Sequence, residues 1–381
     1  MTKSPIPAPV LRTSRRTVLV LQGGGALGAY QAGVFEGLAE AGLAPDWVAG
    51  VSIGAINASL IAGNPVGRRI ERLHAFWSRI TASTAHWPRV PLRAWQGAEQ
   101  KAGAAAALLF GQPGFFRPHA PLDWLRPTPP VSYYDTAALR ATLEELVDFD
   151  LINAHARHGT TRLSVGAVQV ESGNMVYFDS KSTVLGAAHV MASGALPPGL
   201  AMVEIDGAAY WDGGLVSNTP LQYVVDEEPR QDALIFQVDL FPARGPRPTN
   251  LDEAGEREID IRYSSRTRSF TDATRAAHDR RRRLHRFLER LPPDLRDDPA
   301  AVQLRADACP AQVDVVHLIY HPQTPQGAQK DFQFDRASME RRWRQGKEDA
   351  RQTVAAAPWQ TPAPPDIGLR TFDVLAPAHR R

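Results

Sequence analysis

Short apolar runs alternate with segments of helical spacing at the start of the chain. Thr17–Leu21 is a β-branched run that ends at three glycines, and Ala26–Gly42 then places apolar side chains at helical intervals before a glycine stop. Trp47–Val51 is a second apolar run, and the helical segment Ala55–Ala62 follows it. This strand, helix, strand, helix order predicts a parallel sheet with helices on both faces.

The middle of the chain changes character. From about residue 84 to 133 the aromatic side chains follow no regular period, and we interpret this stretch as an insertion over the site that forms either an apolar groove or lid, or irregular core: Trp87, Trp95, Phe110, Phe115, Phe116 and Trp124. Beyond it, the pattern predicts an amphipathic helix, a strand pair and a hairpin that turns at Asp206-Gly207. Their segments are Thr136–Val147, Arg162–Val170 with Met175–Phe178, and Val203–Ile205 with Ala209–Trp211.

The C-terminal third predicts further strands and two charged helices. Thr219-Pro220 predicts a helix with Thr219 as its N-cap and a proline in its first turn, and Asp232–Leu240 and Val313–Tyr320 have the composition of central strands. Between them lies the basic helix Arg275–Leu291, whose apolar side chains we expect to face a core: Leu284, Phe287, Leu288 and Leu291. Arg336–Arg351 predicts a charged helix, and the Pro-rich run after it predicts no regular element.

Composition sets bounds on the class of protein. The chain has 381 residues, of which 43% are apolar and 22% charged, as in a soluble globular protein with one large domain and an appendage. Cys309 is the only cysteine, so no internal disulfide forms. No run approaches the roughly 18 apolar residues of a membrane span, and the apolar run after Arg15-Arg16 is too short for an export signal. We expect a cytoplasmic protein, for which peripheral contact with the inner membrane is allowed.

A serine stands where the second predicted strand gives way to a helix. Residues 50–54 have the pattern G-x-S-x-G, the sharp strand-to-helix turn that exposes a serine hydroxyl, here that of Ser52. Gly50 and Gly54 allow the backbone of this turn to pack closely. The pattern is weak alone, but the strand before it and the helix after it supply the required context. Ser52 is therefore the candidate nucleophile.

The glycine-rich loop after the first strand is the candidate oxyanion site. Right-handed crossovers place the ends of sequential parallel strands at the same edge of a sheet, which brings residues 23–28 beside Ser52. Unpaired N–H groups at a helix N-terminus favour a developing oxyanion, and losing one donor costs on the order of 3 kcal/mol. We expect Gly24, Gly25 and Ala26 to supply these donors.

Asp212 is the candidate base, because a serine hydroxyl is a poor nucleophile until its proton is removed. It follows the second strand of the predicted hairpin, and Gly213 and Gly214 after it allow a sharp turn that leaves the carboxylate accessible. An ordinary aspartate has a pKa near 3.9 and is a weak base at neutral pH. This role therefore requires a partly desolvated site that raises the pKa.

Four motifs occur in order along this part of the chain: Gly23–Tyr30, Gly50–Gly54, Ala192–Pro198 and Asp212–Gly214. Together they resemble the patatin-like phospholipase family, in a bacterial subgroup with a C-terminal extension. The resemblance covers about residues 16–225. It implies a three-layer α/β/α fold with a mostly parallel central sheet, a Ser52–Asp212 dyad without a catalytic histidine, and hydrolysis of acyl esters in phospholipids or other lipids. Leu27 departs from the family, since many members have Arg or Lys there and this chain lacks that cation.

The expected domain organisation follows from these segments. Residues 1–15 form a flexible leader and residues 16–225 the patatin-like core, which includes the insertion at about 84–133. Residues 226–330 continue the core with the basic helix, and residues 331–381 form the C-terminal extension.

Three other functions remain open. Residues 23–28 also fit a dinucleotide-binding fingerprint, but the acid that it requires at the end of the second strand is missing, and Asp46 precedes that strand. The order of serine, aspartate and then His317 or His321 fits a Ser-His-Asp esterase, although the early glycine loop and elbow are not the α/β-hydrolase layout. The third is a non-catalytic lipid-binding or scaffold protein, whose serine a fluorophosphonate would not label.

The expected partner is a lipid or ester substrate. No clustered His or Cys spacing indicates a metal, and we expect no cofactor. Arg280–Arg283 are placed either on a solvated helix face, which we favour, or against anionic headgroups. The net charge of +2 and the lack of a recognisable module argue against nucleic acid. The sequence leaves the oligomeric state, head group and acyl length open.

Overall fold

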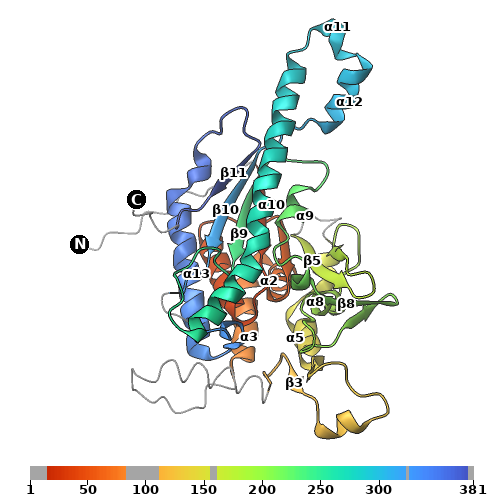
Figure 1. Cartoon of the computed structure of the whole chain (residues 1–381), viewed down its shortest axis with the longest axis vertical. Coiled ribbons are helices and arrows are strands. Elements are labelled where there is room, and N and C mark those ends of the chain that lie inside the picture. Colours follow the sequence, from red (N-terminus) through yellow and green to blue (C-terminus); the bar gives the residue numbers. More distant parts are fainter. Residues whose placement is uncertain (1–14, 83–110, 155–160, 323–325, 376–381) are drawn as a thin grey trace, which may run out of the picture.

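The computed structural model describes residues 15–82, 111–154, 161–322 and 326–375, around a nine-stranded sheet (Figure 1). The strand order is β11-β10-β9-β1-β2-β5-β8-β7, with β6 also paired to β5. The parallel strands are β1 (Arg16–Leu21), β2 (Trp47–Val51), β5 (Arg162–Gln169), β9 (Ala233–Asp239), β10 (Val313–Ile319) and β11 (Leu369–Phe372). Antiparallel pairing brings in β6 (Met175–Asp179), β7 (Val203–Ile205) and β8 (Ala208–Asp212). The predicted mostly parallel sheet is confirmed.

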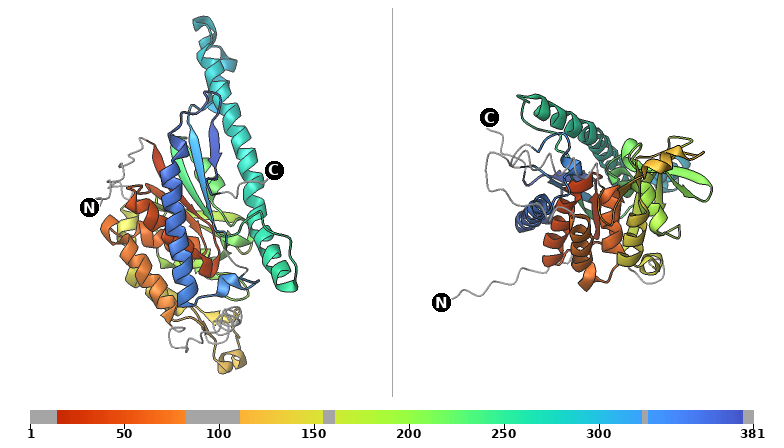
Figure 2. Two further views of the ribbon diagram at one scale, coloured as in Figure 1. Left: turned by 90° about the vertical axis from the view of Figure 1, so that its left-hand side faces the viewer. Right: turned by 90° about the horizontal axis from the view of Figure 1, so that it is seen from below.

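Helices cover both faces of this sheet (Figure 2). In β1, Leu19 and Leu21 pack into the larger apolar cluster, which includes side chains of α1 (Ala29–Glu40), α2 (Ile53–Ala62), α3 (Arg69–Ile80) and α13 (Arg336–Ala356). Val18 and Val20 point to the opposite face and pack with α9 (Leu221–Val225). Successive side chains of a strand alternate between faces, so a strand that is apolar throughout is buried on both.

The predicted elements of the N-terminal half lie close to their expected places. The segment from residue 26 to 42 is divided into a 3-10 turn, η1 (Gly25–Gly28), and α1, and Gly42 ends it with a φ of 76°. The hairpin between β7 and β8 turns at Asp206 and Gly207, whose φ angles are 51° and 81°. α5 (Ala137–Leu146) is the predicted amphipathic helix. One detail was wrong: α9 begins at Leu221 with Pro220, not Thr219, as its N-cap.

Part of the aromatic insertion belongs to the core. Phe115 and Phe116 are buried, and their rings contact those of Phe76, Phe334 and Tyr134. Trp124 is exposed. The other aromatic residues that suggested an insertion lie outside the described residues: Trp87, Trp95 and Phe110.

The basic helix is longer and more exposed than predicted. α10 spans Leu251–Glu289, and its N-cap Asn250 accepts a hydrogen bond from the Glu253 amide at 2.9 Å. Its end projects from the body with α11 (Pro293–Arg296) and α12 (Pro299–Asp307), at the top of Figure 1. Leu288 is buried there, but Phe287 is 61% exposed, so the expectation that Phe287 faces a core was wrong. A projecting helix that packs against α12 on one side leaves its other sides in solvent.

The C-terminal residues join the central sheet. α13 packs along α1, and β11 pairs in parallel with β10, with Leu369 opposite Val313. β11 lies in the Pro-rich run for which the sequence predicted no element. Within the described residues, no helix combines the length and apolar composition that crossing a bilayer requires.

Candidate functional site

Ser52 lies in a strained turn between β2 and α2. Its φ is 57° and its ψ is −125°, a conformation that costs a residue with a side chain about 1–3 kcal/mol. The Ser52 amide donates to both the Oγ and the carbonyl oxygen of Ser193, at 3.0 and 3.1 Å. Ser193 is fully buried, and its own hydroxyl donates to the Gly166 carbonyl at 2.6 Å. The block at residues 192–198 thus holds the elbow in place.

The two glycines of the elbow occupy its tightest contacts. A Cβ on Gly50 would lie 2.3 Å from the Gly54 carbonyl oxygen, and one on Gly54 would lie 2.3 Å from that of Leu21. No side chain fits at either distance. Because Gly50 and Gly54 lack side chains, the start of α2 packs against the end of β1. This packing brings Ser52 beside the glycine loop, as the sequence predicted.

Asp212 also lies near Ser52, at the end of β8, which β5 separates from β2. It is the last residue of β8, it pairs with Ala167 of β5, and its amide donates to the Ala195 carbonyl at 3.0 Å. The turn through Gly213 follows at once, and the Gly214 amide donates to the Asp212 Oδ1 at 2.7 Å. The side chain is buried, with only 3% of the residue exposed.

The Ser52 side chain lies close enough to the Asp212 carboxylate to lower its pKa. Burial has the larger effect and raises the pKa of Asp212 to about 6, while Ser52 and the Gly214 amide offset part of this rise. This is the desolvation that the sequence interpretation required. Such a carboxylate is mostly ionised at neutral pH and is a stronger base than an ordinary aspartate.

The glycine loop presents unpaired amides at the start of a helical turn. η1 begins at Gly25, whose φ is 52°, and the Leu27 amide donates to the Gly24 carbonyl at 3.1 Å. Among the described residues, the amides of Gly24, Gly25 and Ala26 have no hydrogen-bond acceptor, as is usual for the first N–H groups of a helix. These are the three predicted oxyanion donors.

Asn218 connects the loop to the turn after Asp212, and the sequence did not single it out. Its Nδ2 donates to the Gly23 carbonyl at 3.0 Å, and its carbonyl accepts from the Gly23 amide at 3.1 Å. Its Oδ1 is 2.9 Å from the position of a Cβ on Gly214. An asparagine a few residues after an aspartate carries no signal in a single sequence, so only the fold reveals this position.

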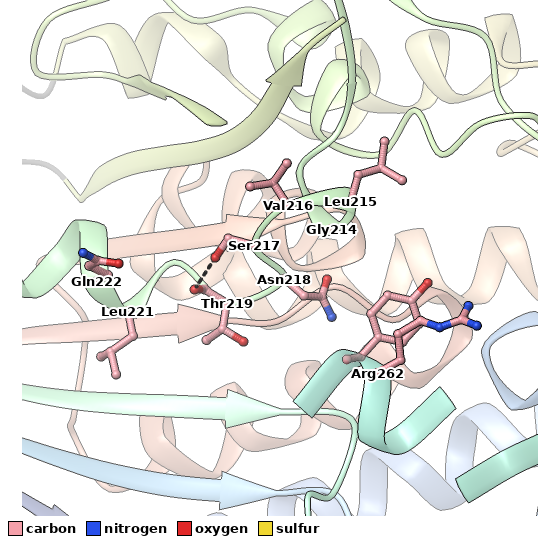
Figure 3. A pocket seen from close by; sticks show the side chains of 10 residues that line it. Gly214, Leu215, Val216, Ser217, Asn218, Thr219, Leu221, Gln222 and Arg262 are labelled. Carbon is pink, nitrogen blue, oxygen red and sulfur yellow. Dashed lines mark hydrogen bonds between the residues drawn. The ribbon is translucent and has the colours of Figure 1, made fainter. Parts of the chain in front are cut away.

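A pocket of about 220 Å³ opens next to this turn (Figure 3). Its lining begins two residues after Asp212, and the Ser217 hydroxyl donates to the Thr219 carbonyl across the loop at 3.3 Å. α10 supplies the opposite wall. The lining residues are Gly214–Thr219, Leu221, Gln222, Arg262 and Tyr263.

The two histidines considered as bases lie far from the elbow. His317 is in β10, where its Nδ1 is 3.4 Å from Asp239 Oδ2, and His321 follows the same strand. β10 is three strand spacings from β2, or about 14 Å at about 4.8 Å per spacing. Asp46 precedes β2 and accepts from the Thr17 amide at 2.8 Å, at the opposite end of the strand from the glycine loop. Neither alternative site is assembled.

Comparison with known families gives an independent result. A model described as patatin-like phospholipase matches residues 19–225, which is more than half of the chain. The chain belongs to the patatin-like phospholipase family. A second model, described as patatin phospholipase, matches residues 261–366, which include most of α10, all of β10 and all of α13.

Several solved structures are similar to this chain at low sequence identity. VipD from Legionella pneumophila matches with 14% identity over 90% of this chain and 67% of its own, at a TM-score of 0.40. Human GIVD cytosolic phospholipase A2 matches with 11% identity over 90% of this chain and 59% of its own, also at 0.40. ExoU of Pseudomonas aeruginosa, in complex with SpcU, matches with 19% identity over 69% and 52%, at 0.28. None of the curated proteins compared matches the chain.

Proposed function

We propose that this patatin-like chain hydrolyses acyl ester bonds of phospholipids or other lipids, with Ser52 as nucleophile and Asp212 as base. The placement of Ser52 in the strained turn, close to the buried Asp212 carboxylate whose pKa is about 6, carries the proposal. A base of this kind accepts the serine proton near neutral pH without a histidine.

The reaction has two steps. Asp212 accepts the Ser52 proton as Oγ attacks the ester carbonyl carbon, and the amides of Gly24, Gly25 and Ala26 stabilise the oxyanion that forms. The oxyanion collapses, the ester C–O bond breaks, and the alcohol leaves with the proton from Asp212. Water then attacks the acyl-enzyme and gives a proton to Asp212, which returns it to Ser52 Oγ as the fatty acid leaves.

The pocket after Asp212 is assigned to the substrate. Its volume of about 220 Å³ is below the roughly 300–1,000 Å³ of sites that enclose a whole small molecule. It therefore receives only part of a lipid.

Hydrolysis of a soluble ester and of a phospholipid by matched variants tests the proposal. Ser52→Ala and Asp212→Asn should each lose about 10³-fold or more in kcat, because nucleophile and base act as one unit. The double variant His317→Ala/His321→Ala should stay within about threefold of wild type, since neither histidine reaches Ser52. Loss only in the histidine variant would transfer the base role, and a wild type inactive on all esters would favour a lipid-binding scaffold.

We also propose that the chain contacts a lipid surface through the segment 121–133, which has exposed apolar side chains. Tyr133 and Tyr134 fix its end beside the site, since their amides donate to the Pro198 and Gly199 carbonyls at 3.0 and 2.9 Å. Aromatic and leucine side chains gathered on one exposed surface are typical of a membrane interface. The exposed residues are Leu122, Trp124, Leu125, Val131 and Tyr133.

A pair of double variants tests this contact. Leu122→Ser/Leu125→Ser should weaken binding to vesicles of equal phosphatidylglycerol and phosphatidylcholine about tenfold, and leave hydrolysis of a soluble ester unchanged. The matched control is Leu295→Ser/Val302→Ser, which changes exposed apolar residues on the projecting helices at the opposite end of the long axis (Figure 1). Equal behaviour of the two variants would refute the contact.

A further inference from the structure

The C-terminal segment covers the glycine loop. The carbonyl oxygen of Asp331 lies 2.3 Å from the position of a Cβ on Gly25, so the two backbones touch. Asp331 belongs to a 3-10 turn, η7 (Lys330–Phe332), which packs on η1. The candidate oxyanion loop is thus braced by residues about 300 positions further along the chain.

Arg342 of α13 joins both turns. It is only 1% exposed, and its Nη1 donates to the Ala26 carbonyl at 3.1 Å and to the Gln333 carbonyl at 3.0 Å. Its Nη2 donates to the Lys330 carbonyl at 3.0 Å and to the side-chain oxygens of Gln326 and Gln333 at 3.1 and 3.2 Å. One buried guanidinium therefore holds η1 and η7 together.

The charge of Arg342 is not cancelled by a direct ion pair. Among the described residues, no carboxylate oxygen lies within 4.0 Å of its guanidinium. Asp331 is close enough to interact with it: burial raises the pKa of Asp331 to about 6, and the nearby charges of Lys330 and Arg342 offset part of that rise. Hydrogen bonds from a charged donor are about twice as strong as neutral ones.

A chain of hydrogen bonds leads from this charge to a candidate oxyanion donor. Arg342 donates to the carbonyl of Ala26, whose peptide group carries the Leu27 N–H. The Leu27 N–H donates to the Gly24 carbonyl, whose peptide group carries the unpaired Gly25 N–H. Hydrogen bonds in series polarise one another, by about 10–30% per bond. A positive charge at one end makes the Gly25 N–H at the other end a stronger donor.

α13 is fixed well enough to position such a group. A Cβ on Gly346 would lie 2.1 Å from the Tyr30 carbonyl oxygen, so α13 and α1 are in backbone contact. The Trp343 indole donates to Glu36 Oε2 at 2.5 Å, and Lys347 donates to Glu36 Oε1 at 2.8 Å. Arg342 therefore sits on a helix clamped to the one that follows the glycine loop.

We propose that Arg342 is a positioning residue for ester hydrolysis, which holds the Gly24–Ala26 loop and polarises the Gly25 amide through the Ala26 and Gly24 carbonyls. The proposal rests on the proposed function of that loop. It also gives the loop a cation from α13 in a chain that has Leu27, not a basic residue, within the loop itself.

The test compares Arg342→Met, Arg342→Lys and the control Arg344→Met, which changes an exposed arginine on the same helix. Arg342→Met should lower kcat on a soluble ester about 10- to 100-fold with KM within about twofold, because a weakened oxyanion donor acts on the transition state. Arg342→Lys should recover part of the loss, and Arg344→Met should match wild type. Affinity for an alkyl boronic acid, whose tetrahedral adduct mimics the oxyanion, should fall in parallel with kcat.

Active-site titration with a fluorophosphonate separates this role from simple unfolding. If the loss of kcat in Arg342→Met equals its loss of titratable Ser52, or if kcat per titrated site stays within threefold of wild type, the proposal is wrong while the dyad stands. Undiminished hydrolysis by Ser52→Ala would instead overturn the proposed function of the whole site.

Discussion

Two glycine-rich turns lie side by side at the ends of β1 and β2, but different parts of the chain hold them. The elbow around Ser52 is held by Ser193 and by the end of β1, all within the first 225 residues. The loop around Gly25 is held by Asp331 and Arg342, from the C-terminal segment. Asn218 also ties the glycine loop to the first 225 residues, so the candidate oxyanion site depends on both regions of the sequence and the elbow on one.

The contacts that hold the proposed site therefore extend beyond the segment that the patatin-like model matches. The second family match, to residues 261–366, covers the segment that braces the loop. Changes there are expected to alter stabilisation of the transition state and to leave the Ser52–Asp212 pair intact. Changes around the elbow are expected to disable the pair itself.

The largest expected loss of kcat/KM comes from replacing one glycine in each turn, Gly50 or Gly25, by alanine. Gly50→Ala places its Cβ against the Gly54 carbonyl and should abolish the elbow, with a loss of about 10³-fold or more in kcat/KM. In Gly25→Ala the new Cβ would clash with the Asp331 carbonyl, and the φ of 52° is unfavourable for alanine. This variant should lose about 10²-fold in kcat/KM, the effect of one displaced oxyanion donor. Rates are compared per folded molecule, with folding followed by circular dichroism. A smaller loss of kcat/KM in Gly50→Ala than in Gly25→Ala would contradict this order.

A smaller expected effect concerns the elbow alone, through the pH dependence that Asp212 gives to the stability of the fold. The pKa of Asp212 is raised from 3.8 to about 6, so its ionised form destabilises the fold by about 3 kcal/mol, at about 1.4 kcal/mol per pKa unit. The cost is absent below pH 3.8, grows as the pH rises, and is complete above about 6. Asp212→Asn should therefore have a higher Tm than wild type at pH 8 and a similar Tm near pH 4. A variant less stable than wild type at pH 8 would argue against this cost.

The sequence predicted the elbow side well because its signals are local. β1, η1 with α1, β2 and α2 follow one another, and apolar periodicity with glycine placement is enough to order them. The hairpin before Asp212 was predicted from Asp206-Gly207 for the same reason. The roles of Ser52, Asp212, Gly24, Gly25 and Ala26 remain proposals.

The bracing of the loop was not predictable because it depends on distant pairing. β11 has four residues among prolines and is defined by its partner β10. The first half of α10 is strongly polar, so its apolar period is weak. Arg342 is one of many arginines in a charged helix, and nothing in its neighbours distinguishes the buried one from exposed ones such as Arg344.

The most direct test of the central claim is the rate at which a fluorophosphonate labels the protein as a function of pH, with the modified residue identified by mass spectrometry. The account predicts a label on Ser52 alone, a rate that rises about tenfold per pH unit below about 6 and levels off above it, and the same profile in His317→Ala/His321→Ala. A label on another residue, a rate independent of pH between 4 and 8, or a profile lost with the histidines would contradict it.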